Sequence, residues 1–268
     1  MKLGKVWVSA VAVCLVASLA GPATFAQKVP ANWRQIGAAG DWANTVAMTA
    51  MDGLIWSIES DGTLFRTNRA GAYEQLGPKG AFRNATLLEA FDGNLYTVEN
   101  GTLYRTNPET RRWRQLGKAG DWSNTVALAS TGGFLWSLES DGTLYRVTRD
   151  GEYEQLGPTG AFSEARFLAA MGGKLWTVER GTLYSTDPAR GTWRQVGQRG
   201  AWKNTRGLAA SNGILWSLES DGTLYKTDRT GTRYTQVGET GEYANTEMLL
   251  SFDGKLYTVE NGTLYATR

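Results

Sequence analysis

The sequence contains no histidine and a single cysteine among its 268 residues. Without histidine there can be no Ser-His-Asp or Cys-His catalytic site, no histidine-bound zinc and no histidine pH switch. Because Cys14 has no second cysteine to pair with, an internal disulfide is excluded and stability must come from a packed core. No acid pair stands out from the rest either. We therefore predict no catalytic residue, no bound metal and no cofactor.

An excess of charge of one sign is also missing. Lys2 and Lys5 are the only charged residues in the first 26 positions, and the remaining chain has equal numbers of acidic and basic residues. Proteins that bind nucleic acid or an anionic membrane surface draw on a basic excess. We expect no nucleic-acid partner and no electrostatic attachment to a membrane.

Long apolar runs are confined to the N-terminal region. Lys2 and Lys5 precede an apolar run over residues 6–20, and Thr24 and Ala26 place small residues before a cleavage point. This order is typical of a secretory signal peptide. We predict a signal peptide over 1–26, a folded domain over 27–268 with no transmembrane segment, and export to the periplasm or secretion. A membrane anchor is the alternative, but the run is shorter than the roughly 20 residues that span a bilayer.

What the sequence does have is an internal repeat. The motif Trp33-Arg34-Gln35-Ile36-Gly37 returns at intervals of 40 or 41 residues, starting at Tyr73, Trp113, Tyr153, Trp193 and Tyr234. Between these motifs lies a second one, and its turn alternates between a longer form, Glu-Ser-Asp-Gly, and a form one residue shorter. Units of about 40 residues that contain short strands are typical of propeller blades. The alternation indicates an approximate threefold symmetry of doublets.

Each unit divides into four short strands, which we name a to d. In the first unit we predict them over residues 46–51, 54–59, 63–67 and 73–77, because Asp-Gly and Ala-Gly turns separate them. The repeats begin with a strand d at Trp33 and finish with strands a, b and c over 246–268. That first strand d can complete the last unit and cover its open edge. We therefore predict an all-β, six-bladed β-propeller of four-stranded blades, monomeric, in which the N-terminal strand completes the C-terminal blade.

Comparison of the six units identifies columns of equivalent residues. We expect core packing for a large apolar column on strand a (Met48, Leu88, Leu128, Leu168, Leu208, Leu249) and for aromatic columns on strand b (Trp56, Tyr96, Trp136, Trp176, Trp216, Tyr257) and strand c (Phe65, Tyr104, Tyr145, Tyr184, Tyr225, Tyr265). A glutamate ends strand b in every unit, from Glu59 to Glu260. We interpret it as a carboxylate that accepts hydrogen bonds from neighbouring loop N–H groups, with a ligand or ion role as the alternative.

The loop from strand d to the next strand a, here the d–a loop, carries the candidate binding residues. In each unit an aromatic residue is followed two positions later by Asn, or once by Glu: Trp42 and Asn44, Phe82 and Asn84, Trp122 and Asn124, Phe162 and Glu164, Trp202 and Asn204, Tyr243 and Asn245. Aromatic rings beside amides and carboxylates suit sugars, whose apolar faces stack on rings and whose hydroxyls need donors and acceptors. The alternative is structural: the ring fills the seam between blades and Asn caps the turn.

The first position of strand a varies among the units, and it should lie at the mouth of the central channel. Arg166, Arg206 and Glu247 occupy it in the last three units. We treat these three as candidates for binding an anionic group. Alternatively, they could pair with one another.

The repeated motifs resemble a known family. An aromatic strand followed by Gly, and then Gly-x-Leu-Trp-Ser-Leu-x-Ser-Asp-Gly-Thr-Leu-Tyr-Arg, is similar to the tectonin or tachylectin-type propeller repeats over residues 33–268. The resemblance implies lectin-like recognition of glycans or lipopolysaccharide, with about one weak site per blade, and it places the candidates in the d–a loops.

We therefore expect an exported, non-enzymatic module that binds glycans or lipopolysaccharide at repeated sites, where repetition supplies avidity. The alternative is a scaffold for protein partners in the cell envelope or outside the cell. A third possibility is a hydrolase, because six-bladed sialidases exist. However, the Ser60-Asp61-Gly62 turn has the wrong spacing for their motif.

Overall fold

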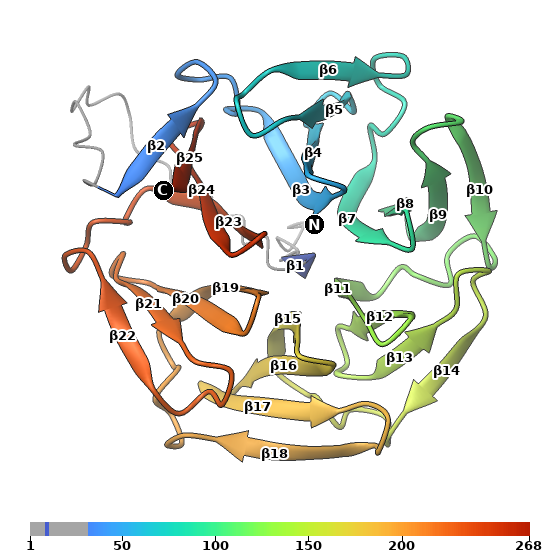
Figure 1. The fold of residues 1–268 in the computed structure, drawn as a ribbon. Coiled ribbons are helices and arrows are strands. Elements are labelled where there is room, and N and C mark those ends of the chain that lie inside the picture. Colours follow the sequence, from blue (N-terminus) through green and yellow to red (C-terminus); the bar gives the residue numbers. More distant parts are fainter. Residues whose placement is uncertain (1–8, 11–31) are drawn as a thin grey trace, which may run out of the picture.

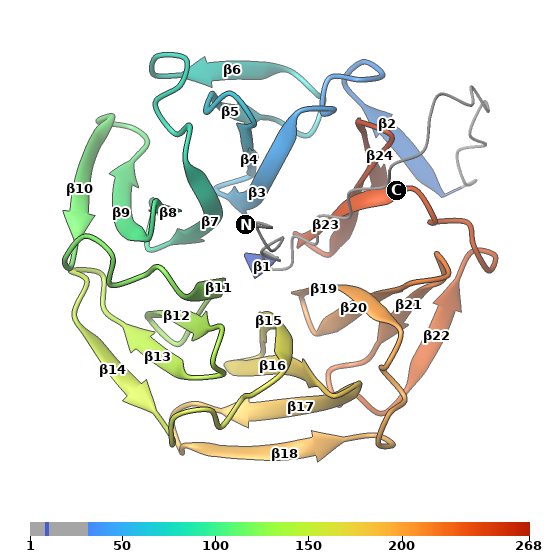
Figure 2. The same ribbon diagram turned by 180° about the vertical axis from the view of Figure 1, so that it is seen from behind.

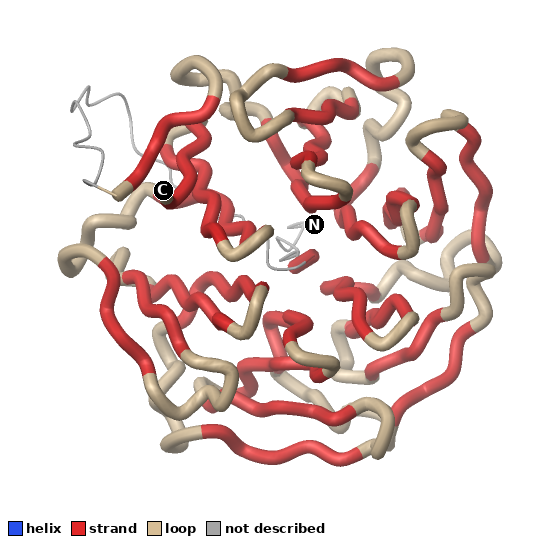
Figure 3. Tube along the Cα trace, in the orientation of Figure 1, coloured by secondary structure: helices blue, strands red, loops and turns tan. Residues whose placement is uncertain are grey.

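The computed structural model describes residues 9–10 and 32–268, and in this part of the chain strands are joined by turns and loops without a helix (Figure 3). The predicted signal peptide over 1–26 lies outside the described residues, except for β1 (Ser9–Ala10), which pairs in parallel with β11. No helix in the described residues is long and apolar enough to cross a membrane.

Six blades, each built on four antiparallel strands, stand side by side around a central axis, as Figures 1 and 2 show from the two sides, and β1 adds a parallel strand to the blade that contains β11. Blades 1 to 3 consist of β3 (Thr45–Met51), β4 (Leu54–Glu59), β5 (Leu64–Thr67) and β6 (Tyr73–Leu76); β7 (Ala85–Phe91), β8 (Asn94–Glu99), β9 (Thr102–Asn107) and β10 (Arg112–Leu116); and β11 (Thr125–Thr131), β12 (Phe134–Glu139), β13 (Leu144–Val147) and β14 (Tyr153–Leu156). Blades 4 to 6 consist of β15 (Ala165–Met171), β16 (Lys174–Glu179), β17 (Thr182–Asp187) and β18 (Thr192–Val196); β19 (Thr205–Ser211), β20 (Ile214–Glu219), β21 (Leu224–Thr227) and β22 (Tyr234–Val237); and β23 (Thr246–Phe252), β24 (Lys255–Glu260), β25 (Thr263–Thr267) and β2 (Trp33–Ile36).

The ring closes as predicted. Strand β2 pairs antiparallel with β25, with Trp33 opposite Thr267 and Ile36 opposite Leu264, and it forms the outer strand of blade 6 (Figure 1). Just beyond the paired residues, the N–H of Arg268 donates to the carbonyl of Asn32 at 2.8 Å. The six-bladed propeller and its closure by the N-terminal strand are therefore confirmed.

The core lies between neighbouring blades. The large apolar column of strand a and the aromatic column of strand b are almost completely buried, as predicted. The aromatic column of strand c is only half-buried, although Tyr145 and Tyr265 pack against the core, so the prediction of core packing holds only in part for it. Blades diverge from the axis, so a residue nearer the rim meets a wider seam that the adjacent blade does not fill.

A backbone contact repeats at every seam. The N–H of each d–a loop aromatic donates, at 2.8–2.9 Å, to the carbonyl of the glycine in the b–c turn of the preceding blade. Trp42 bonds Gly262 in this way across the point of ring closure, and Phe82 bonds Gly62 at the next seam. The d–a loops and the b–c turns therefore share one face of the disc, which we call the loop face.

Strand a carries a β-bulge near its start in all six blades. The register of strands a and b shifts between Thr45 and Ala47 in blade 1, and at the corresponding positions in the other blades. The bulge contains the variable first position identified in the sequence. A bulged residue is not held in the regular ladder and its side chain can be re-aimed, which explains how this position tolerates valine, threonine, arginine and glutamate.

Candidate functional site

Blades 1, 3 and 5 each carry a pocket between the d–a loop that leads into the blade and the blade's own strands b, c and d. The three pockets have volumes of ≈ 420, 160 and 240 Å³ in blades 1, 3 and 5. Seven equivalent residues line each pocket: Trp42, Asn44, Ser57, Glu59, Asp61, Phe65 and Tyr73; Trp122, Asn124, Ser137, Glu139, Asp141, Tyr145 and Tyr153; and Trp202, Asn204, Ser217, Glu219, Asp221, Tyr225 and Tyr234. We call them the seam pockets. The doublet symmetry predicted from the sequence thus appears as a threefold set of pockets.

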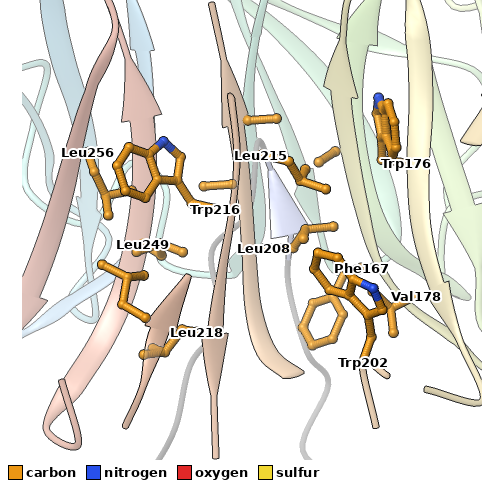
Figure 4. Close-up of a cluster of buried hydrophobic side chains, with 14 of the residues drawn as sticks. Phe167, Trp176, Val178, Trp202, Leu208, Leu215, Trp216, Leu218, Leu249 and Leu256 are labelled. Carbon is orange, nitrogen blue, oxygen red and sulfur yellow. The ribbon is translucent and has the colours of Figure 1, made fainter. Parts of the chain in front are cut away.

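The structure buries the predicted loop aromatics. Trp42, Trp122, Phe162, Trp202 and Tyr243 are buried, and Phe82 is half-buried. Figure 4 shows how this happens in one seam, where Trp202 packs beside Phe167 and Val178 of blade 4. Trp42, Trp122 and Trp202 also line the seam pockets, so these three rings both fill the seam and border a pocket.

The polar residues of the same loops are exposed on the loop face. Asn44, Asn124 and Asn204 line the seam pockets, while Asn84 and Asn245 lie at the equivalent places in blades 2 and 6. Glu164 instead forms an ion pair with Arg180, with 3.2 Å between Oε1 and Nε. The odd blades therefore bring together aromatic and amide groups of the predicted site.

Exposed aromatic rings come from strand d, which sequence reasoning did not single out as a site. Tyr73, Tyr153 and Tyr234 are 64%, 53% and 65% exposed and line the three seam pockets. Each meets an aromatic residue of strand c edge-on, as Phe65 does with Tyr73 at a centroid distance of 5.8 Å. The sequence signal that could have identified them is an aromatic residue at the start of each outer strand.

Three of the six glutamates that end strand b line the seam pockets: Glu59, Glu139 and Glu219. Burial raises the pKa of each, and a threonine hydroxyl of strand a partly offsets that rise. Thr45 donates to Glu59 at 2.8 Å, Thr125 to Glu139 at 2.8 Å and Thr205 to Glu219 at 3.1 Å. The expected partners were loop N–H groups, and that expectation was wrong, because hydroxyl side chains on the blade's own strands reach the carboxylate first.

A second carboxylate borders the pockets at the b–c turn. Asp61 accepts a hydrogen bond from the N–H of Thr63 at 2.9 Å and pairs with Lys79 at 3.0 Å. The contacts to Thr63 and Lys79 lower the pKa of Asp61 to about 2. Contacts with Thr223 likewise lower the pKa of Asp221 in blade 5. The pockets of blades 1 and 5 therefore combine an ionised aspartate with a more basic glutamate.

The channel-mouth candidates separate into different roles. Arg206 donates from its guanidinium to the carbonyls of Glu219, Thr246, Tyr243 and Ala244 at 2.8–3.0 Å, and so joins blade 5 to blade 6. Glu247 is half-buried; burial raises its pKa, and a hydrogen bond from the N–H of Gly262 partly offsets this. Arg166 is exposed. Arg206 therefore holds two neighbouring blades together through backbone carbonyls.

Each seam pocket offers hydroxyl, amide and carboxylate groups beside aromatic rings. Within the described residues, no group of three or more acidic side chains is close enough to hold a metal ion. Such walls can pair with the hydroxyls of a sugar and cover its apolar face.

Solved structures with the same fold have diverse functions. Virginiamycin B lyase from Staphylococcus aureus has a TM-score of 0.59 at 15% identity, over 85% of this chain and 81% of the lyase. A streptogramin B lyase also has a TM-score of 0.59, at 10% identity over 88% and 97% of the two chains. YCF48 bound to D1 peptide has a TM-score of 0.55 at 13% identity, over 88% and 95%.

These similarities establish the fold, and two of them correct the sequence analysis. We predicted a non-enzymatic protein, yet the similar structures include lyases. Excluding enzymatic activity because the sequence lacks histidine and a distinct acid pair was therefore wrong, because enzymes are built on this fold, which by itself does not determine function.

Sequence comparison identifies a family. No curated protein matches the sequence. A family described as "Repeat of unknown function (DUF6923)" matches residues 19–197, about two thirds of the chain. The chain therefore belongs to this family of repeat proteins.

Proposed function

We propose that the protein binds glycans through the three seam pockets and gains avidity from their repetition around one ring. The observation that carries the proposal is the recurrence of the same seven pocket positions in blades 1, 3 and 5. A ligand that repeats, such as a polysaccharide or the sugar part of lipopolysaccharide, can engage several pockets at once. The similarity to tectonin-type repeats and the predicted export support the same role.

The pocket chemistry favours a sugar over a purely apolar ligand. Tyr153 contacts both Trp122 and Tyr145 with its ring, at centroid distances of 5.9 and 5.6 Å, and Asn124, Ser137 and Glu139 line the same pocket. Tyrosine combines a ring face with a hydroxyl, and amide, serine and carboxyl groups supply both donors and acceptors. Each pocket is open to solvent at the rim, which suits weak binding of one unit of a longer chain.

The test is stepwise removal of the exposed tyrosines. Tyr73→Ala, Tyr153→Ala and Tyr234→Ala are combined one, two and three at a time, after a glycan array has selected a ligand. We expect each substitution to remove one site in titration calorimetry, and the triple variant to lose binding. Reaction products are analysed in the same experiment, because lyases share this fold.

The chain provides matched controls. Trp113 and Trp193 occupy the same strand position in blades 2 and 4, are 69% and 54% exposed, and do not line the seam pockets. Trp113→Ala and Trp193→Ala should leave glycan binding unchanged. A triple tyrosine variant that still binds with wild-type affinity would rule out the seam pockets as the site.

A second candidate is a scaffold for a protein partner. Five large aromatic residues are exposed on the outer strands, around the rim: Tyr73, Trp113, Tyr153, Trp193 and Tyr234. Exposed aromatic residues are enriched at protein interfaces. Under this function, Trp113→Ala and Trp193→Ala should weaken the complex with an identified protein partner. Under the glycan-binding function, the same two substitutions should leave binding unchanged.

A further inference from the structure

A cluster of arginines lies between blades 2 and 3, at the edge formed by a–b and c–d turns, opposite the loop face. Arg105, Arg112 and Arg114 come from blade 2, and Arg149 comes from the c–d turn of blade 3. Together with Asp92 and Asp150 they line a pocket of ≈ 460 Å³. Four guanidinium groups face two carboxylates, although the chain after residue 26 has no net charge.

The arginines are arranged at a cost to blade stability. Arg105 and Arg114 are directly opposite each other in the register of β9 and β10, so two like charges face the same side of the sheet. Like charges in such cross-strand pairs are destabilising. Blades 1 and 3 have opposite charges at the same pair of positions, Arg66 with Glu74 and Arg146 with Glu154, and both pairs form salt bridges.

The carboxylates in the pocket do not neutralise this charge. Asp150 is shared among three arginines, at 3.4 Å from Arg105, 3.8 Å from Arg114 and 3.7 Å from Arg149. In the described part of the chain, the guanidinium of Arg112 makes no hydrogen bond or ion pair. The pocket therefore has guanidinium donors available and an excess of positive charge.

We propose that this pocket binds a phosphate or sulfate group, either free or carried on a sugar. Guanidinium groups match tetrahedral oxyanions with pairs of charge-assisted hydrogen bonds. A bound oxyanion accepts hydrogen bonds from Arg112 and Arg114 and screens the repulsion between Arg114 and Arg105. Blade 4 has Ser185 opposite Arg194, with Thr192 at the position of Arg112, so the site belongs to the seam between blades 2 and 3. The proposal does not depend on glycan binding in the seam pockets.

The decisive variant is Arg114→Glu, which gives blade 2 the arginine–glutamate pair found in blades 1 and 3. We expect inorganic phosphate to bind the wild-type protein saturably in titration calorimetry and to raise its melting temperature. The variant should bind phosphate about tenfold more weakly or worse, as expected for the loss of a charge-assisted hydrogen bond. Its melting temperature without phosphate should not fall, which separates lost binding from lost folding.

Two further variants locate the site. Arg112→Thr, which copies Thr192 of blade 4, should also weaken phosphate binding, whereas Arg194→Glu changes the same charge in blade 4 and should leave it intact. Equal losses for Arg114→Glu and Arg194→Glu, or wild-type affinity in Arg114→Glu, would overturn the proposal. Glucose 6-phosphate, glucose and inorganic phosphate are compared to distinguish a sugar-borne from a free oxyanion. Arg114→Glu should retain glycan binding, and the triple tyrosine variant should retain phosphate binding.

Discussion

Gly142 shows how closely a single turn residue is built into the contact between blades. Its φ is +82°, and a Cβ at this position would lie 2.3 Å from the backbone nitrogen of Ser163 in the next loop. The N–H of Phe162 donates to the carbonyl of Gly142 at 2.9 Å. This hydrogen bond between blades requires the loop that carries Phe162 and Ser163 to lie directly against Gly142. The turn therefore needs glycine for its conformation and for space.

We predict that Gly142→Ala destabilises the protein much more than Gly132→Ala. Gly132 also has a positive φ, +62°, but nothing lies within 4 Å of its Cβ position. Left-handed backbone strain alone costs about 1–2 kcal/mol, and the clash at Gly142 adds about 1–3 kcal/mol. Denaturant unfolding of both variants measures the difference. If both variants lose the same free energy of unfolding, the close contact at Gly142 does not contribute to stability and the prediction is wrong.

Glu89 is the buried acid that the repeat pattern does not explain. It lies on β7 opposite Tyr96 and is 0% exposed. The equivalent residues in the other blades are Thr49, Ala129, Ala169, Ala209 and Leu250. Burial raises the pKa of Glu89 from 4.5 to about 8, and nearby Ser130 offsets this only in part. The carboxyl is therefore protonated in the folded protein at neutral pH.

We expect the free energy of unfolding to fall as the pH rises from about 4.5 to about 8. In that interval the folded chain holds a proton on Glu89 that the unfolded chain has released, so rising pH favours unfolding. Glu89→Gln should remove this component of the pH dependence, as measured by denaturant unfolding at several pH values. Glu109→Gln, at a residue whose side chain is 79% exposed, is the control and should keep the wild-type slope.

Strand β2 differs from the other five outer strands in what its aromatic residue does. Trp33 is 3% exposed, and its indole N–H donates to the hydroxyl of Tyr243 at 3.0 Å, whereas the equivalent aromatics of the other blades are more than half exposed. The closing strand is thus secured by a buried side chain as well as by its ladder.

We predict that Trp33→Ala lowers the free energy of unfolding by about 3–5 kcal/mol, the range for loss of a buried aromatic ring. Trp193→Ala, at the same strand position in blade 4, should change it by no more than about 0.5 kcal/mol. Thermal unfolding and size-exclusion chromatography measure stability and self-association. A Trp33→Ala variant as stable as Trp193→Ala would mean that β2 contributes little to closure.

The strands were predictable because glycine-containing turns mark their ends. In blade 1 each observed strand boundary lies within one residue of the predicted one. The bulge in strand a was not predictable, because an extra residue leaves the alternation of a seven-residue strand almost unchanged. Arg206 lies in the bulge of blade 5, and its side chain reaches blade 6 from there. Its contacts with blade 6 could therefore not be predicted from the sequence either.

The sequence could predict which residues contribute to the candidate site, but not how exposed each of them is. Equivalent positions such as Trp42, Trp122 and Trp202 could be aligned because six copies of one unit lie in a single chain. Whether an aromatic side chain faces a filled or an open seam depends on distance from the axis, which the alignment does not contain. The arginine pair at 105 and 114 likewise required the register between β9 and β10.

Across the ring as a whole, the seam pockets predict a stoichiometry. A short monovalent sugar should titrate with three sites per chain, because the pockets of blades 1, 3 and 5 share the same lining positions. A polymer of that sugar should bind far more tightly, since the later contacts are intramolecular. Calorimetry with both ligands tests this. One site per chain would contradict the functional equivalence of the three pockets.

Because β2 and β25 share a sheet, the fold has a definite order of completion. Blades 1 to 5 each consist of contiguous residues and can pair as they leave the ribosome, but Trp33–Ile36 must wait for Leu264–Thr267. Bringing these ends together carries the chain-entropy cost of a very long loop. That cost is small if the intervening blades have already curved the polypeptide back on itself. Strand β2 therefore finds its partner only after β25 has been synthesised.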